Sequence, residues 1–331
     1  NGFFKDVIRR TSIIAVELLA GLLGIAILLF ALLCWRLSAG PMSLAFATQY
    51  IERAMSLEES GVEVKIEETA LVWAGWDNAF DIRVNNATVL GSGGKVLASL
   101  PEVSVGISIS ALFRGLIAPN RLEVHGLSAT VERGGDGKFV LGFFARSDSV
   151  ADKEFVNRIP AYITLLSKPG DPSSVFGYLD SVQISDVDIR YLDRPNGGEW
   201  HSPDSDIELL RGDEGMEAIA SMALDFGDRS TQLRAHAVFA PERPVVDIGI
   251  EFDKLFPSDF AERIAQLRQF EKINLPLSGQ IRVLAQHSGT VNSVAFDVKG
   301  AGGSVAGNVI VDANQDYDVT MNIAGLRATT L

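Results

Sequence analysis

The feature that most constrains the fold is an alternation of apolar and polar residues in short segments between Val62 and Ile323. In the clearest segment, Val103, Val105 and Ile107 are separated by single serine or glycine residues. Successive side chains of a β-strand point to opposite faces, so this spacing predicts strands with one apolar and one polar face. Turns rich in glycine, proline and asparagine separate these segments. The sequence therefore predicts a mostly β fold built from antiparallel neighbours.

The alternation is interrupted by a segment that contains Pro160, Pro169 and Pro172. We expect a short helix near Val150–Asn157 and a linker in this segment. The expected divisions of the chain are 1–12 (cytoplasmic N-terminus), 13–35 (transmembrane helix), 36–60 (juxtamembrane helix), 61–146 (first β-groove segment), 147–177 (helix and linker) and 178–331 (second β-groove segment). Because the chain begins with Asn1 rather than methionine, we expect it to be a piece of a longer one.

Two further helices are predicted from apolar residues at spacings of three and four. One covers Met42–Leu57, and we expect it against the start of the sheet or along a membrane surface. The other covers 258–272, where Ser258 and Asp259 follow Pro257 as a helix-start signal. We expect this second helix to pack over an edge or end of the sheet.

An apolar run of 21 residues, Ile13–Leu33, contains one charged residue, Glu17. As a helix it spans about 30 Å, which matches the hydrocarbon thickness of a bilayer. The apolar core of a signal peptide is usually shorter, about 7–15 residues, so we expect an uncleaved anchor. Lys5, Arg9 and Arg10 precede the run, and only Arg36 closely follows it. The positive-inside rule therefore predicts a cytoplasmic N-terminus, with the rest of the chain outside.

The apolar faces of so many strands must be shielded from water. Helices, closure into a barrel, a second sheet or a bound ligand can each shield them. The predicted helices are too few, so we expect a long sheet curled over its own apolar face, forming a groove suited to acyl chains. Alternation assigns to this groove Val62, Val64, Ile66, Phe80, Ile82, Val84, Val103, Val105, Ile107, Ile109, Leu122 and Val124.

Composition and motifs argue against most other chemistry. The chain has 42 acidic and 29 basic side chains, a net charge of −13, which repels the phosphate backbone of nucleic acid. The single cysteine, Cys34, lies at the end of the apolar run. The segment Gly91–Lys95 lacks the glycine spacing of a phosphate-binding loop and predicts a turn. The histidines lack the spacing of metal ligands: His125, His201, His236 and His287. We predict no catalytic residues, no metal site and no cofactor.

Several stretches resemble the N-terminal region of AsmA-like envelope proteins. They are Ala98–Val105, Ser110–Gly115, Arg121–Leu127 and Asp136–Phe139. Leu275–Ile281 and the glycine-spaced hairpins after it resemble the larger YhdP-type branch of that family. The resemblance covers most of the chain, and its motifs consist of apolar alternation with placed glycine and proline.

This resemblance implies a bridge-like lipid-transfer protein of the inner membrane. Its fold would be an elongated, taco-like β-groove with a chorein-like start at 61–146, in the periplasm. It would carry phospholipid toward the outer membrane and would not be an enzyme. Two alternatives remain open at this stage: a membrane-anchored structural or interaction scaffold of the cell envelope, and an anchored enzyme acting on envelope polymers.

Overall fold

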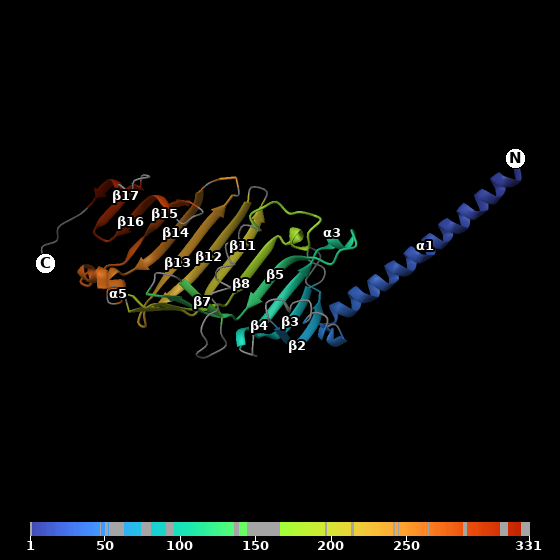
Figure 1. The fold of residues 1–331 in the computed structure, drawn as a ribbon, viewed down its shortest axis with the longest axis horizontal. Helices are drawn as coiled ribbons and strands as arrows, with labels where there is room; N and C mark the ends of the chain where they lie inside the picture. Colours follow the sequence, from blue (N-terminus) through green and yellow to red (C-terminus); the bar gives the residue numbers. More distant parts are fainter. Residues whose placement is uncertain are drawn as a thin grey trace.

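The computed structural model describes residues 2–46, 48–49, 52, 63–73, 81–90, 96–135, 139–143, 166–195, 197–212, 215–240, 242–243, 245–261, 263, 265–286, 290–311 and 317–325. The chain forms one long helix followed by an extended sheet (Figure 1). The helix, α1 (Gly2–Ser38), projects from one end of the sheet. Within its stretch Glu17–Ser38, an 18-residue window has a mean hydropathy of 2.7, so the stretch is long and apolar enough to cross a membrane, a property that a signal sequence shares.

The strands after α1 all belong to one 18-stranded hydrogen-bonded sheet, which confirms the mostly β prediction. The alternating patterns of valine, isoleucine and threonine explain why these segments are extended. Their bounds are β1 (Met42–Ser43), β2 (Glu63–Val72), β3 (Asp81–Leu90), β4 (Val96–Ile107), β5 (Pro119–His125), β6 (Ser128–Arg133), β7 (Phe139–Phe143), β8 (Ser181–Ser185), β9 (Asp188–Asp193), β10 (Gly198–Ser202), β11 (Ser205–Gly212), β12 (Gly215–Asp225), β13 (Ser230–Phe239), β14 (Val245–Leu255), β15 (Leu277–Gln286), β16 (Val291–Gly300), β17 (Gly303–Val311) and β18 (Tyr317–Ala324).

The long part of the sheet pairs its strands in the order β1, β2, β3, β4, β5, β8, β11 and then β12 through β18. Strands β7, β6, β9 and β10 form a shorter hydrogen-bonded group beside it. Pairing is antiparallel except for β5 with β8 and β6 with β9, which are parallel. The predicted antiparallel order is thus corrected at these two places, because β8 begins at the end of the sheet at which β5 begins, with Ser181 paired to Arg121.

The short helices differ from their predicted bounds. The expected helix at 258–272 is instead a short α-helix, α5 (Pro257–Ala261), followed by the 3₁₀ helix η3 (Ala265–Phe270). The expected helix Met42–Leu57 begins later, because Met42 and Ser43 form β1 and pair with Leu71 and Ala70. The helix expected near 150–157 lies outside the described residues. Two elements were not predicted, α3 (Ile109–Leu112) and the 3₁₀ helix η2 (Val175–Tyr178).

Three neighbouring strands of the long sheet are each interrupted by two residues at the same level. Gly126 and Leu127 separate β5 from β6, and Asp186 and Val187 separate β8 from β9. Pro203 and Asp204 separate β10 from β11. Hydrogen bonds join these interruptions, such as Gly126 N to Ser185 O at 3.1 Å. Gly126 and Asp186 have φ values of 72° and 55°, and a left-handed residue inside a strand bends it.

The two groups of strands share one apolar cluster at these interruptions. Two of its buried members, Leu127 and Val187, lie within the interruptions, and the third, Ala129, lies in β6. Partly buried side chains from both groups pack against these three: Leu100, Val124, Ile184 and Ile189. Burial of this apolar surface holds the shorter group against the long sheet.

Candidate functional site

The register of the long sheet aligns apolar side chains into rows that cross it from β2 to β18. In one row every position is apolar. Its members, each paired with the next, are Leu71, Ile82, Val105, Leu122, Val182, Leu209, Ala218, Ala237, Ile248, Val283, Val294, Val309 and Val319.

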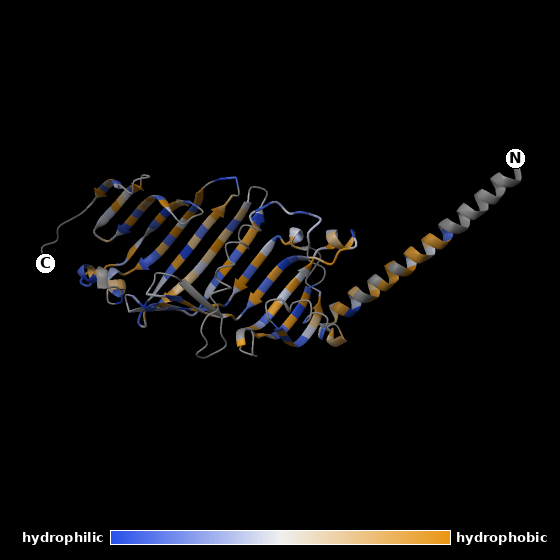
Figure 2. Ribbon diagram, viewed as in Figure 1, coloured by the Kyte–Doolittle hydropathy of each residue, from blue (hydrophilic) through white to orange (hydrophobic). Residues whose placement is uncertain are grey.

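A second row runs parallel to the first, two residues away along each strand. It comprises Thr69, Val84, Val103, Val124, Ile184, Ile207, Ala220, Ala235, Ile250, Ile281, Phe296, Gly307 and Met321. We call the surface made by both rows the apolar face. Side chains two residues apart in a strand lie on the same side of a sheet, so the two rows form one continuous surface. The apolar and polar bands that alternate along the strands are visible in Figure 2.

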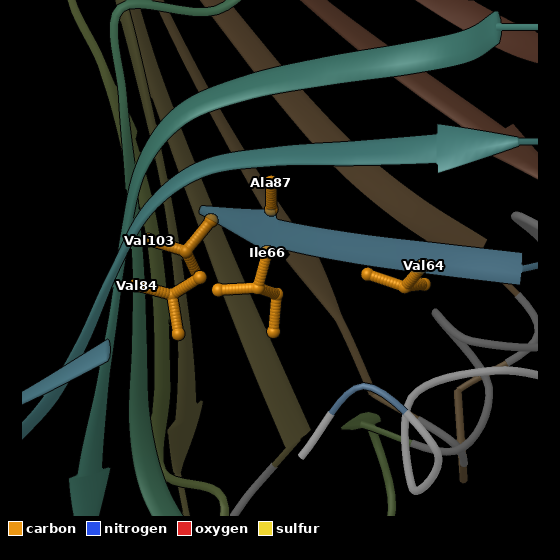
Figure 3. Close-up of a cluster of buried hydrophobic side chains, with 5 residues drawn as sticks. All are labelled: Val64, Ile66, Val84, Ala87 and Val103. Carbon is orange, nitrogen blue, oxygen red and sulfur yellow. The ribbon is translucent and has the colours of Figure 1, made fainter. Parts of the chain in front are cut away.

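Exposure of the apolar face increases along the sheet. At the β2 end, Val84 and Val103 are buried, and they pack with Val64, Ile66 and Ala87. Figure 3 shows this cluster, in which Ile66, Val84 and Val103 point toward one another. In the middle strands the same face is partly buried. At the β18 end it is open, with Met321 57% exposed and Val319 52% exposed.

Residues that follow α1 are hydrogen-bonded to β2 beside the buried end of the face. Leu44 N donates to Thr69 O at 2.8 Å, and Thr48 Oγ1 donates to Thr69 Oγ1 at 3.0 Å. Thr69 is a member of the second row, so the helical residues that follow β1 lie beside the apolar face. Glu52 Oε1 accepts a hydrogen bond from Ile66 N at 2.8 Å. Of the two positions expected for this helix, the described residues Leu44, Thr48 and Glu52 take the one against the start of the sheet.

Most of the residues predicted for the groove lie on this face. The structure places together Val64, Ile66, Ile82, Val84, Val103, Val105, Leu122 and Val124. Val62 and Phe80 lie outside the described residues. Ile107 is the last residue of β4, where the register shifts. Ile109 is a correction: it belongs to α3 rather than to the strand, because Ser108 accepts a hydrogen bond from Ala111 N through its Oγ and starts a helical turn.

The groove residues named from the sequence stop at Val124, although 178–331 was predicted as a second groove segment, and the larger part of the face lies there, on β8 and on β11 through β18. Its apolar residues alternate as clearly as those of the first strands, for example Ile248 and Ile250 on β14. The alternation was therefore the signal that could have found them. Their alignment into rows depends on the register between strands, which a single segment does not carry.

The opposite face carries the charges. Arg83 forms an ion pair with Glu102 at 3.1 Å, and Arg121 bridges Asp81 at 2.9 Å and Glu123 at 3.2 Å. A hollow of about 500 Å³ also lies on this face, where its lining includes Arg234, Glu251, Asp253, Gln280, Asp297 and Lys299. These groups are polar and mostly exposed. The hollow therefore does not suit a hydrocarbon chain, which favours the apolar face as the lipid-facing surface.

On β14 and β15, the Arg282 guanidinium donates to both carboxylate oxygens of Asp247, from Nε to Oδ1 at 2.8 Å and from Nη2 to Oδ2. These hydrogen bonds lower the pKa of Asp247 below its ordinary value, while partial burial opposes the shift. The same contacts raise the pKa of Arg282. The pair joins neighbouring strands on the charged face and leaves both groups ionised at neutral pH.

Polar groups that could support catalysis meet at one place. Ser185 Oγ lies 2.5 Å from His125 Nδ1, and Glu123 Oε2 lies 3.9 Å from His125 Nε2. Glu123 is also paired with Arg121. The three side chains lie on the charged face of β5 and β8, outside the 500 Å³ hollow, so they do not form a substrate site with it. Among the residues that the structure describes, no three histidine, cysteine or acidic side chains are grouped as metal ligands.

No protein-family model, curated protein or solved structure matched this chain.

Proposed function

We propose that this chain is a membrane-anchored lipid-transfer protein and that its apolar face binds the acyl chains of phospholipid. The observation that carries the proposal is the pair of apolar rows, which continue from β2 to β18 without a charged member. A surface of this kind binds hydrocarbon without directional contacts. A lipid could therefore lie along its exposed part, which increases toward β18.

The resemblance to AsmA-like envelope proteins supports the same function. In this proposal α1 stays in the inner membrane with its N-terminus in the cytoplasm, and the sheet lies in the periplasm. The exposed apolar side chains of Glu17–Ser38 suit a lipid environment. The bends at Gly126 and Asp186 would curl the sheet over its apolar face, in the taco-like form that the resemblance implies.

The proposal can be tested with two adjacent substitutions on β15. Ile281 is a member of the second row, whereas Gln280 lies on the opposite face and is exposed. Native mass spectrometry of the full chain, purified in mild detergent, should detect bound phospholipid. An Ile281→Asp variant should lose most of it because a charge in the row is incompatible with hydrocarbon.

The Gln280→Asp variant introduces the same charge one residue away and should keep the lipid. Circular dichroism of both variants separates lost binding from lost folding. Absence of phospholipid from the wild-type chain, or equal lipid content in the two variants with a folded sheet, would contradict the proposal.

A second candidate function, an interaction scaffold, is favoured by the edge of the sheet at β18. Among the described strands β18 pairs only with β17, and Tyr317, Val319, Met321 and Ile323 are exposed on it. An uncovered apolar edge is a template for a strand from another chain. A Val319→Lys and Met321→Lys variant should abolish an edge-mediated complex in light scattering, whereas Ile281→Asp should leave that complex intact. Persistence of the complex would argue against the scaffold.

A further inference from the structure

The loop that joins β4 to β5 exposes an unusual set of side chains. Phe113 is 89% exposed and Ile117 is 76% exposed, and Ile109 and Leu112 are also exposed. Isolated apolar side chains are common on protein surfaces, but four of them within nine residues form a patch. Phe176 on η2 is exposed as well. We call residues 108–118 the α3 loop.

The α3 loop is held firmly in this arrangement. Ser108 N donates to Ala118 O at 2.9 Å, which closes the base of the loop, and Leu116 N donates to Ala111 O at 3.0 Å. Ala111 and Ala118 are buried against Tyr178 of η2. The fold therefore buries the small side chains of the loop and presents the large apolar ones outward. The exposure of the large side chains therefore follows from the hydrogen bonds and the packing of the loop.

The register places the α3 loop at the same end of the strands as α1. Met42, four residues after α1, pairs with Leu71, and Leu71 belongs to the row that continues through Ile82 to Val105. β4 ends at Ile107, two residues beyond Val105, and the α3 loop follows. β1 and β4 are three strand spacings apart, about 14 Å. Figure 1 also shows α3 and the C-terminal end of α1 at the same end of the sheet.

The position of α1 then fixes what the α3 loop faces. Leu37, in the last turn of α1, is buried, so the end of the helix is packed against the rest of the chain. Trp35 is exposed, and tryptophan is typical of the boundary between lipid and water. If α1 crosses a bilayer, as in the proposed function, the surface of that bilayer lies near Trp35 and within reach of the loop.

The charge of the α3 loop is compatible with the surface of a bilayer. The chain as a whole has a net charge of −13, but the loop contains one basic residue, Arg114, and no acidic one. Arg114 Nη1 donates to the hydroxyl of Tyr178 at 2.8 Å. This hydrogen bond holds the guanidinium against η2. An arginine beside exposed apolar side chains matches the boundary between lipid phosphates and acyl chains.

We propose that the α3 loop is a second membrane contact, in which Phe113 and Ile117 insert into the leaflet from which α1 emerges. The inference rests on the membrane anchor of the proposed function. Two attachment points, the helix and the loop, would fix the tilt of the sheet over the bilayer. They would hold the β2 end of the apolar face close to the lipid surface.

The contact can be tested in the full chain, reconstituted in vesicles of phosphatidylethanolamine and phosphatidylglycerol. Cys34 is replaced by serine, and a single cysteine is introduced as Phe113→Cys and labelled with an environment-sensitive fluorophore. Lipids that carry a quencher in the acyl chain report contact with hydrocarbon. The matched variants are Trp35→Cys, at the end of α1, and Gln280→Cys, on the charged face of β15.

We expect at least a twofold loss of fluorescence at positions 113 and 35 and little loss at position 280. A label at position 113 that behaves like the one at 280, while position 35 is quenched, would overturn the inference and leave the anchor intact. Absence of quenching at both 35 and 113 would overturn the anchor together with the inference. Lipid content of the same samples, measured by mass spectrometry, reports separately on the apolar face.

Discussion

Phe296 on β16 and Gly307 on β17 are paired across the sheet, and the aromatic ring covers the glycine. A Cβ atom added at Gly307 would lie 2.6 Å from Phe296 Cζ and 2.9 Å from the carbonyl oxygen of Thr320. Both distances are shorter than real Cβ contacts. Aromatic side chains placed over glycine in this way compensate for its weak intrinsic preference for strands. The glycine is therefore needed for packing within the second row.

We predict that Gly307→Val destabilises the sheet, although valine favours strands. Relief of the overlap requires movement of both the ring and the neighbouring backbone, and overpacking of this kind costs about 1–3 kcal/mol. Urea unfolding followed by circular dichroism measures the change. Asn308→Val alters the next residue, which lies on the opposite face of β17, and should change stability by less than about 0.5 kcal/mol. Equal stability of the two variants would contradict the packing argument.

A second prediction concerns the bend between β5 and β6. Gly126 has a φ of 72°, and a Cβ at this position would meet only Pro101, at 3.6 Å, which is an ordinary contact. The cost of Gly126→Ala therefore comes from the left-handed backbone and should be about 1–2 kcal/mol of unfolding free energy. Gly302→Ala is the control, because a Cβ there meets nothing within 4 Å. Unchanged stability of Gly126→Ala would show that the bend does not depend on this backbone conformation.

Which face of the sheet a residue lies on could be predicted from the sequence, whereas some strand pairings and strand ends could not. Val103 and Val105 were assigned to the apolar face correctly because alternation is a local property of one strand. The partnership of Val124 with Ile184 could not be predicted, since it is a parallel pairing across a segment without alternation. Ile109 was misplaced because its pattern continues that of β4. The deciding factor, capping by Ser108, gives a signal too weak to end a strand by itself.

The ion pair between Asp247 and Arg282 predicts a pH dependence of stability. Because the pKa of Asp247 is lower in the folded chain, the contribution of the pair is present above the unfolded value of about 4 and is lost as the pH falls through the folded value. The stability difference between wild type and Asp247→Asn should therefore shrink below about pH 4. Thermal unfolding between pH 3 and 7 measures it.

Glu251→Gln is the matched control, since it removes a carboxylate from the same strand. Its stability difference from wild type should change less over this range than that of Asp247→Asn. A difference for Asp247→Asn that stays constant down to pH 3 would show that the hydrogen-bonded pair does not contribute to folding.

The last prediction separates an open apolar face from a closed core. Val84 and Met321 belong to the same row, but Val84 is 2% exposed and Met321 is 57% exposed. Val84→Asp buries an unpaired carboxylate and should lower the free energy of unfolding by about 3 kcal/mol or more. Met321→Asp leaves its charge in contact with water and should cost less than about 1 kcal/mol. Urea unfolding of lipid-free protein measures both, and equally large losses would mean that the row is packed along its whole length, which a lipid-binding face cannot be.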